Sequence, residues 1–254
     1  MNKSDQYHKF AADYEWLFSD TTQPGEPEIE ELMPILTAFN KPRILDCACG
    51  TGSTALALAR RGYQVLGTDA SSSMVVLARG HAAEQKQQVP FEVCAWEFLP
   101  ATIHEPVDLV ICLGNSLGHC RDEHEMLRSL QGMRAVLREG GRLVIESRNW
   151  EKLHADRVRF THFGLRERAG IRCIPLYVWN FGREFHEPLV VEVVIVFERQ
   201  GKVQLRTYDI AYQPFHTEQL HSLLEQAGFS NLTNDWTSQA HSYRVVASAG
   251  TLNP

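Results

Sequence analysis

The sequence lacks the features that mark membrane, secreted and metal-dependent proteins. Its most apolar run, LVVEVVIVF at 189–197, is too short to span a bilayer and is interrupted by Glu192. No apolar h-region lies near the start, so we expect no signal peptide and a cytoplasmic protein. The six cysteines are scattered without a C-x-x-C pair, which favours reduced structural thiols and predicts no metal site.

Positive charge is also scarce. The chain has 25 Lys and Arg against 31 Asp and Glu, a formal net charge of −6, and no basic run stands out. We therefore expect no general attraction to nucleic acid or to an anionic membrane. The 254 residues, with 44% hydrophobic and 22% charged side chains, suffice for one large domain or a domain with a substantial insertion.

Short apolar strands alternate with amphipathic helices over the first 156 residues. The expected strands lie at 43–48, 63–69, 89–95, 107–113 and 142–147, and the expected helices at 5–18, 26–39, 53–62, 71–84 and 122–141. A helix at 216–227 and strands at 229–237 and 241–248 return to the same sheet. This alternation predicts an α/β fold with a doubly wound, Rossmann-like, mostly parallel seven-stranded sheet.

The pattern changes between residues 157 and 213. Segments 158–164, 171–181, 189–199 and 202–213 read as longer strands joined by turns. We expect residues 1–156 and 214–254 to form the cofactor-binding domain. Residues 157–213 would then be an antiparallel β insertion, a lid that covers the substrate site at the carboxyl ends of the parallel strands.

The stretch ILDCACGTG at 44–52 places two glycines directly after an expected strand. Glycine lets a backbone approach a cofactor closely, and the pattern G-x-G-x-x-A from Gly50 also passes as a dinucleotide fingerprint. Asp69 ends the second strand, where an acid can hold ribose hydroxyls. NAD and S-adenosylmethionine both fit so far. Asp46 favours S-adenosylmethionine, because a carboxylate suits an ammonium and a sulfonium group and sits awkwardly beside a pyrophosphate.

With LDCACGTG as a first motif and GTDAS at the second strand, the chain resembles the class I S-adenosylmethionine-dependent methyltransferases. It is similar in particular to the glycine N-methyltransferase family, which includes the glycine/sarcosine enzymes. That likeness rests on CAWEF at 94–98, DLVICLGNSLGH at 108–119 and RLVIESRNW at 142–150. It implies an enzyme that methylates a small amino acid or related amine and leaves S-adenosylhomocysteine.

The resemblance implies a cofactor site as well. Ala48 would line the methionine end and Asp69 the ribose, while Ala95 and Trp96 would flank the adenine. Where this chain has Ala95, the family has an asparagine, and the family's arginine near the methionine carboxylate has no match within 21–29. The full expected cofactor set is Tyr7, Tyr14, Asp46, Ala48, Gly50, Gly52, Asp69, Met74, Ala95, Trp96 and Leu113.

Asn115 and Arg148 match the substrate-binding asparagine and arginine of the amino-acid methyltransferases. Arg148, at the end of the fifth strand, could clamp a substrate carboxylate bidentately. Asn115 could orient the amine through its side-chain oxygen. His119 is the candidate proton acceptor, although a loop histidine more often makes a local hydrogen bond. The candidate walls of the substrate pocket are Tyr177, Trp179 and Tyr212, for which core packing is the alternative.

Three alternatives remain beside amino-acid N-methylation. The chain could methylate a ring nitrogen or hydroxyl of another small metabolite, act as an NAD-dependent oxidoreductase, or bind adenosylmethionine without catalysis. Methylation of DNA bases is disfavoured, because the run after the fourth strand, at 114–117, is GNSL rather than N/D-P-P-Y. The expected partner is therefore a small-molecule substrate.

Overall fold

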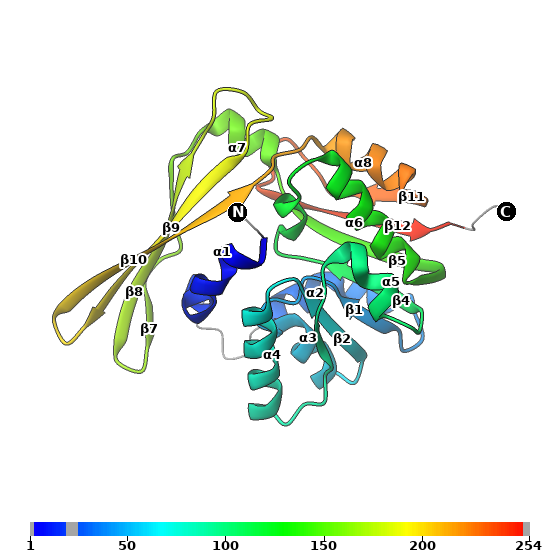
Figure 1. The fold of residues 1–254 in the computed structure, drawn as a ribbon, viewed down its shortest axis with the longest axis horizontal. Coiled ribbons are helices and arrows are strands. Elements are labelled where there is room, and N and C mark those ends of the chain that lie inside the picture. The colour runs from blue at the N-terminus through cyan, green and yellow to red at the C-terminus, as the bar shows by residue number, and fades with distance from the viewer. Residues whose placement is uncertain (1–2, 19–24, 251–254) are drawn as a thin grey trace.

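A seven-stranded sheet forms the centre of the protein (Figure 1). The structure is a computed structural model that describes residues 3–18 and 25–250. The strands are β1 (Arg43–Asp46), β2 (Gln64–Asp69), β3 (Phe91–Val93), β4 (Val107–Cys112), β5 (Leu137–Arg148), β11 (Phe229–Asn234) and β12 (Ser242–Ala249). Their order is β11-β12-β5-β4-β1-β2-β3. The first five are parallel, whereas β12 runs antiparallel to β5 and β11 antiparallel to β12, which confirms the predicted Rossmann-like sheet.

Both faces of this sheet are covered by helices. They are α2 (Glu26–Leu36), α3 (Ser53–Arg60), α4 (Ser72–Glu84), α5 (Leu99–Thr102), α6 (Glu123–Ala135) and α8 (Thr217–Gln226), whereas α7 (Trp150–Asp156) follows β5 and lies beside the second sheet. Successive strand residues enter different cores: Leu45 packs in one hydrophobic cluster and Ile44 in the other. Strands buried on both faces need near-continuous apolar runs, which is what the sequence supplies in β1 and β4.

The predicted end of helix α6 is wrong. The helix predicted at 122–141 ends at Ala135, and β5 begins at Leu137. The N–H of Val107 already donates to the carbonyl of Val136 at 2.9 Å, because sheet pairing there replaces the last helical turn. Gly140, which suggested a helix stop, lies inside β5 with φ of +71°. Strand pairing therefore overrides the local helical pattern.

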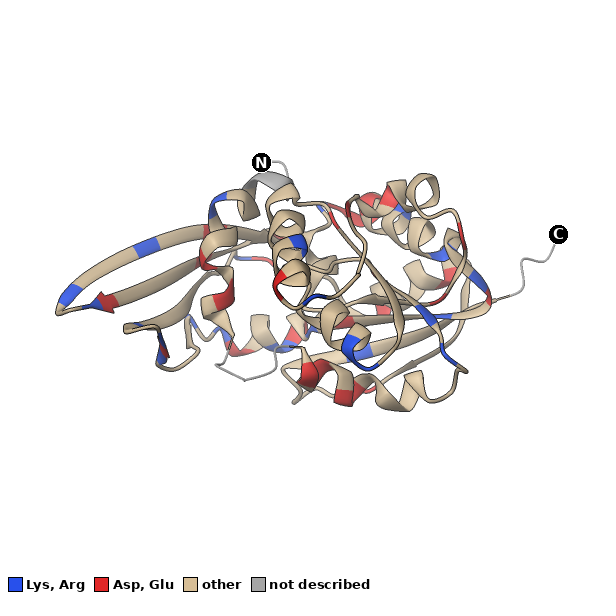
Figure 2. Cartoon of the chain, turned by 90° about the horizontal axis from the view of Figure 1, so that it is seen from below, with Lys and Arg blue, Asp and Glu red and all other residues tan. Residues whose placement is uncertain are grey.

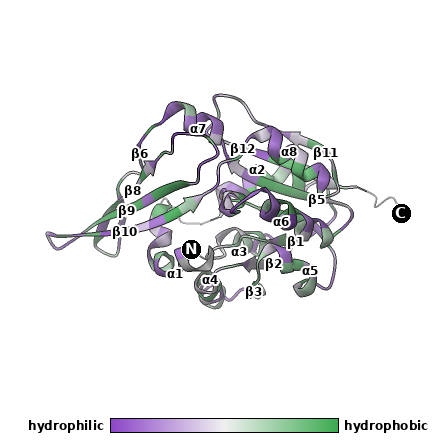
Figure 3. Cartoon of the chain, turned by 45° about the horizontal axis from the view of Figure 1, so that its top comes forward, coloured by the Kyte–Doolittle hydropathy of each residue, from purple (hydrophilic) through white to green (hydrophobic). Residues whose placement is uncertain are grey.

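A second, antiparallel sheet of five strands projects to the left in Figure 1. It contains β6 (Phe160–His162), β7 (Arg166–Arg168), β8 (Ile171–Asn180), β9 (Leu189–Arg199) and β10 (Lys202–Tyr212). The order is β10-β9-β8-β6, and β7 pairs with β8. The strands β8 and β9 carry the hydrophobic colouring of Figure 3, and buried side chains on them, such as Trp179 and Val191, join the core of the first sheet. The short strand β7 and helix α7 had not been predicted.

The N-terminal segment lies between the two sheets. It consists of α1 (Lys3–Phe10) and a 3-10 helix, Ala11–Leu17, where a single helix at 5–18 was predicted. Figure 1 shows α1 in the space between β10 and α4. Figure 2 shows Lys and Arg interspersed with Asp and Glu over the chain. Within the described residues, no helix combines the length and apolar character needed to cross a bilayer.

Candidate functional site

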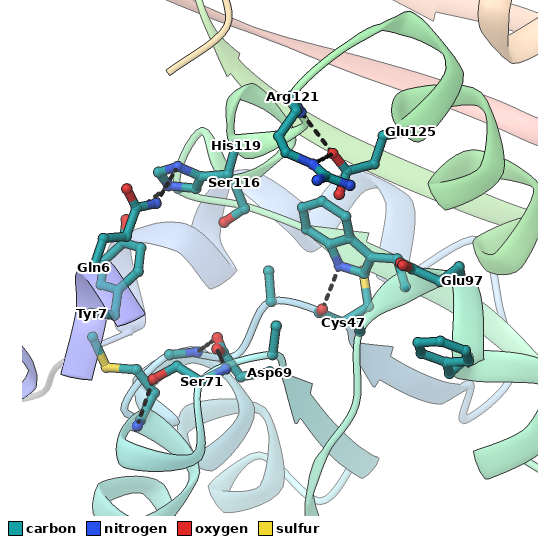
Figure 4. Close-up of a pocket in the computed structure, with 18 of the residues that line it drawn as sticks. Gln6, Tyr7, Cys47, Asp69, Ser71, Glu97, Ser116, His119, Arg121 and Glu125 are labelled. Carbon is teal, nitrogen blue, oxygen red and sulfur yellow. Dashed lines mark hydrogen bonds and ion pairs between the residues drawn. The ribbon is translucent and has the colours of Figure 1, made fainter. Parts of the chain in front are cut away.

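A cavity of about 400 Å³ opens at the carboxyl ends of β1, β2 and β4. The strand order reverses between β1 and β4, and open α/β sheets bind ligands at such a switch point. Figure 4 shows side chains from the N-terminal segment, the loop after β1 and the start of α6 converging on it. The cavity is lined by Gln6, Tyr7, Tyr14, Cys47, Ala48, Gly50, Asp69, Ala70, Ser71, Met74, Ala95, Trp96, Glu97, Phe98, Gly114, Ser116, His119, Arg121 and Glu125.

The loop after β1 forms the floor of this cavity. The N–H groups of Cys47 and Cys49 donate to carbonyls of β4 and β2, both at 3.0 Å, which fixes the loop to the sheet. Gly50 has φ of +52°, and a Cβ there would meet only the ring of Tyr14 at 3.9 Å. Gly52 has φ of +86°, but a Cβ there would lie 2.9 Å from a ring carbon of Phe91. Gly50 therefore faces the cavity, whereas Gly52 allows close packing behind it.

Asp69 ends β2 and lines the cavity, as its sequence position predicts. Its Oδ2 accepts the N–H of Gly50 at 2.9 Å, and its Oδ1 accepts the N–H of Ser71 at 2.8 Å. Burial raises the pKa of this carboxyl, and the two N–H donors oppose that rise. A carboxylate has about four lone-pair sites, so each oxygen can accept one further hydroxyl. The two N–H donors thus fix the side chain at the edge of the cavity, with lone pairs left to accept hydroxyl groups.

Asp46 lies beneath the loop and does not line the cavity. It is buried, with 3% of its surface exposed. Burial raises its pKa to about 7; the N–H of Ala48 lowers the value and the charge of Asp69 raises it further. The expectation of direct contact with the cofactor is not supported by this position. From this position the carboxyl would act on a ligand in the cavity through the field it creates across the loop.

Trp96 walls one end of the cavity, as the motif CAWEF implied. Its Nε1–H donates to the carbonyl of Cys47 at 2.7 Å, so the indole is tied to the loop after β1. Arg121 and Glu125 also line this end, and the Nε of Arg121 donates to the Oε2 of Glu125 at 2.9 Å. Sequence reasoning missed both residues, although Asp122 marks the start of α6 between them as an N-cap.

The opposite end is lined by aromatic side chains. The hydroxyl of Tyr7 lies 2.8 Å from Nε2 of His119, and Nε2 of Gln6 lies 3.2 Å from its Nδ1. The His119 ring stacks on Tyr212, with centroids 4.5 Å apart. Burial raises the pKa of Tyr7 well above its usual range, and burial likewise raises that of Tyr14. These hydroxyls therefore stay protonated at neutral pH, and His119 is hydrogen-bonded to side chains of the N-terminal segment.

Arg148 and Asn115 lie together beside this aromatic end. The Oδ1 of Asn115 accepts the backbone N–H of Arg148 at 3.0 Å, so this oxygen already holds the loop to β5. The guanidinium carbon of Arg148 lies 5.0 Å from the centroid of the Trp179 ring. Within the described chain, Nδ2 of Asn115 and Nε of Arg148 are buried without a hydrogen-bond partner. The pair therefore presents two buried donors and no compensating acceptor.

The expected cofactor residues divide into two groups. Those that line the cavity are Tyr7, Tyr14, Ala48, Gly50, Asp69, Met74, Ala95 and Trp96, together with the candidate catalytic residue His119. Those that do not line it are Asp46, Gly52 and Leu113, and also the substrate candidates Asn115, Arg148, Tyr177, Trp179 and Tyr212. Of the last group, Trp179 is 1% exposed and donates from Nε1 to Thr161 at 3.1 Å, which is the core packing that the sequence left open.

The family model described as "Methyltransferase domain" matches residues 44–141. Among curated proteins, the glycine/sarcosine N-methyltransferase of Parasynechococcus marenigrum (strain WH8102) is 32% identical over 134 residues, 53% of this chain and 48% of that protein. The glycine/sarcosine N-methyltransferase of Aphanothece halophytica is 27% identical over 194 residues, 75% and 73% of the two chains. Glycine N-methyltransferase of Homo sapiens is 32% identical over 164 residues, 59% and 56%. The chain thus spans about half the length of the first and last of these relatives.

Solved structures share the fold over nearly the whole chain. The CcbJ methyltransferase from Streptomyces caelestis has a TM-score of 0.78 and 18% identity, covering 98% of this chain and 100% of its own. An S-adenosylmethionine-dependent methyltransferase from Clostridium acetobutylicum ATCC 824 has a TM-score of 0.74 and 15% identity, covering 96% and 99%. Residues 44–141 of the chain therefore match a methyltransferase domain, and the chain shares the fold of the S-adenosylmethionine-dependent methyltransferases.

Proposed function

We propose that this protein methylates the amine of a small molecule that carries a carboxylate, such as glycine or sarcosine. The observation that carries the proposal is the pair of buried, unpartnered donors on Arg148 and Asn115. A buried donor without a partner costs roughly 1–3 kcal/mol, so an anion that accepts from both would be bound favourably. A carboxylate matches the planar fork of a guanidinium. The names of the curated relatives, glycine and glycine/sarcosine N-methyltransferases, agree with this chemistry.

The local geometry supports a substrate at the aromatic end of the cavity. Gly114 and Ser116, on either side of Asn115, both line the cavity. Asn115 itself has φ of +63°, a left-handed conformation that asparagine tolerates and that turns its side chain toward β5. A carboxylate held by Arg148 would thus lie next to the cavity, with its amine directed into it.

The cofactor would occupy the cavity from Trp96 to Tyr7. We assign the adenine to the Trp96 end, the ribose hydroxyls to Asp69, and the methionine part to the loop at Gly50. When bound, S-adenosylmethionine supplies an electrophilic methyl group on a sulfonium. The residues of the chain then have to hold the amine in line with that methyl and keep water out.

Two tyrosine side chains near Arg148 are suited to keeping water away from the substrate. Burial raises the pKa of Tyr177 and Tyr212, while the positive charge of Arg148 lowers each. At neutral pH both are therefore uncharged donors in an apolar setting. We assign residues 157–213, whose strands carry these side chains, the role of covering the substrate, with residues 1–156 and 214–254 holding the cofactor.

The test compares amines that differ only in the carboxylate. The full-length protein would be incubated with labelled S-adenosylmethionine and glycine, sarcosine, glycinamide or ethanolamine. We expect methylation of the carboxylate-bearing amines and little of the two analogues that lack a carboxylate. Equal turnover of glycinamide and glycine, or turnover of ring nitrogens or hydroxyls alone, would leave the methyltransferase assignment intact and contradict the carboxylate anchor.

A further inference from the structure

Gly132 lies inside a helix, in its last turn. It belongs to α6 and is buried. Glycine in a helix interior is less favourable than alanine, because its backbone loses more conformational freedom on folding. The structure shows what the missing side chain allows. A Cβ built on Gly132 would lie 2.1 Å from the carbonyl oxygen of Trp96, 2.9 Å from its carbonyl carbon and 3.3 Å from Cα of Glu97.

We infer that Gly132 is a positioning residue for the cofactor, because it lets α6 lie directly against the backbone of Trp96. With alanine at position 132, the carbonyl oxygen of Trp96 would have to move by at least about 0.9 Å before its distance from the alanine Cβ reached 3.0 Å. The position of a Cβ is fixed by the backbone of α6, and the atoms it would meet are backbone atoms of Trp96 and Glu97. No side-chain rotation can therefore relieve the clash. The main chain of the short 3-10 helix Trp96–Phe98 would have to shift.

Such a shift reaches the rest of the cavity through one hydrogen bond. The Nε1–H of Trp96 donates to the carbonyl of Cys47 at 2.7 Å, and both residues line the cavity. The same helix contributes Glu125 to the lining. The helix α6 thus sets the position of the wall at the Trp96 end and, through the indole, of the loop after β1. Misplacing a binding group by about 1 Å can cost two decades in a reaction rate.

The test measures cofactor binding without any methyl acceptor, so its result is independent of the substrate proposed above. The variant is Gly132→Ala, and the ligands are S-adenosylhomocysteine and adenosine, titrated calorimetrically into the full chain. We expect both ligands to bind at least about tenfold more weakly. The factor should be similar for the two, because the displaced Trp96 end of the cavity would hold the adenosine part that both ligands contain. Thermal unfolding checks that each variant is folded at the titration temperature.

Gly80→Ala is the matched control. Gly80 lies at a similar place in α4, and a Cβ on it would meet nothing within 4 Å. This variant should gain helix stability and bind both ligands as the unmodified protein does. A second variant, Trp96→Phe, keeps a flat ring but removes the indole N–H, and should weaken binding even if Gly132→Ala does not fold. Full affinity in Gly132→Ala, an equal loss in Gly80→Ala, or unchanged binding by Trp96→Phe would overturn the inference.

Discussion

The side-chain oxygen of Asn115 and the backbone N–H of Arg148 are joined by a 3.0 Å hydrogen bond. This bond decides which way the amide faces, because a backbone N–H can pair only with the oxygen. The NH2 group of Asn115 is therefore the part left for a ligand, and it is buried without a partner among the described residues. The sequence led us to expect the oxygen to orient the substrate amine. With the substrate proposed above, the NH2 group would instead donate to the carboxylate.

Replacing Asn115 by aspartate separates these two roles. Asp keeps the oxygen that holds the N–H of Arg148 and tolerates the left-handed backbone, but it replaces the NH2 donor by a second carboxylate oxygen. We expect kcat/KM for the amino-acid substrate to fall by about one to two decades, corresponding to roughly 1.5–3 kcal/mol. Binding of S-adenosylhomocysteine should be unchanged. Asn231→Asp is the control, since Asn231 is exposed and also has a positive φ of +51°.

Arg148→Lys keeps the positive charge and loses the planar fork over Trp179. We expect kcat/KM for glycine or sarcosine to decrease by about tenfold or more, with little change in cofactor affinity. Arg148→Ala should be more severe. Arg142→Lys is a suitable control, because Arg142 lies on the same strand and its guanidinium carbon lies 5.3 Å from the ring centroid of Phe39, away from the cavity. Normal turnover by both Arg148 variants would remove this residue from the substrate site.

Much of the fold was readable from the sequence because its central strands are apolar and some of its helices begin at recognisable caps. Asp122, for example, accepts the N–H of Glu125 at the start of α6, as such a residue should. The end of the same helix was not readable. Leu137 has good helix propensity, and only its pairing with Val107 on a distant strand places it in β5.

The cofactor site was partly readable for a different reason. Asp69 ends β2 and Gly50 lies in the loop that follows β1. The carboxyl ends of parallel strands meet at one edge of a sheet, so the proximity of these two residues follows from the fold. Arg121 reaches the cavity from a loop whose path no local pattern fixes. Asp46 lies in the same motif, but it is buried and does not line the cavity, which the motif alone does not predict.

Asp69→Asn should weaken binding of S-adenosylmethionine and S-adenosylhomocysteine by roughly 1–3 kcal/mol. Asparagine offers one acceptor oxygen in place of two, so either a backbone N–H or a ribose hydroxyl is left without a partner. Calorimetric titration with each cofactor checks the prediction. Because the effect acts on the ribose, both cofactors should lose affinity equally. Wild-type affinity for the two would exclude Asp69 from the cofactor site.

Asp46 should make the stability of the ligand-free protein depend on pH. Its folded pKa, about 7, lies above the ordinary value of 3.8, so the folded state holds this proton more tightly than the unfolded state. The stability that it contributes is complete below about pH 4 and is lost as the pH rises toward 7, by up to about 4 kcal/mol. Asp46→Asn cannot ionise and keeps an oxygen for the N–H of Ala48. Its free energy of unfolding should therefore fall less steeply between about pH 4 and 7 than that of the unmodified protein.

Chemical denaturation at a series of pH values measures this difference, with Asp209→Asn, an exposed carboxylate on β10, as the control. Saturating S-adenosylmethionine adds a second, sharper outcome. The sulfonium and ammonium charges favour the ionised carboxylate of Asp46 across the loop, so the bound protein should lose less stability with rising pH than the free protein. With S-adenosylhomocysteine, which lacks the sulfonium, the loss of stability with rising pH should be intermediate between those of the free protein and the protein bound to S-adenosylmethionine. Identical slopes for all three states would show that Asp46 has no electrostatic link to the cofactor, and its burial beneath the loop would then be purely structural.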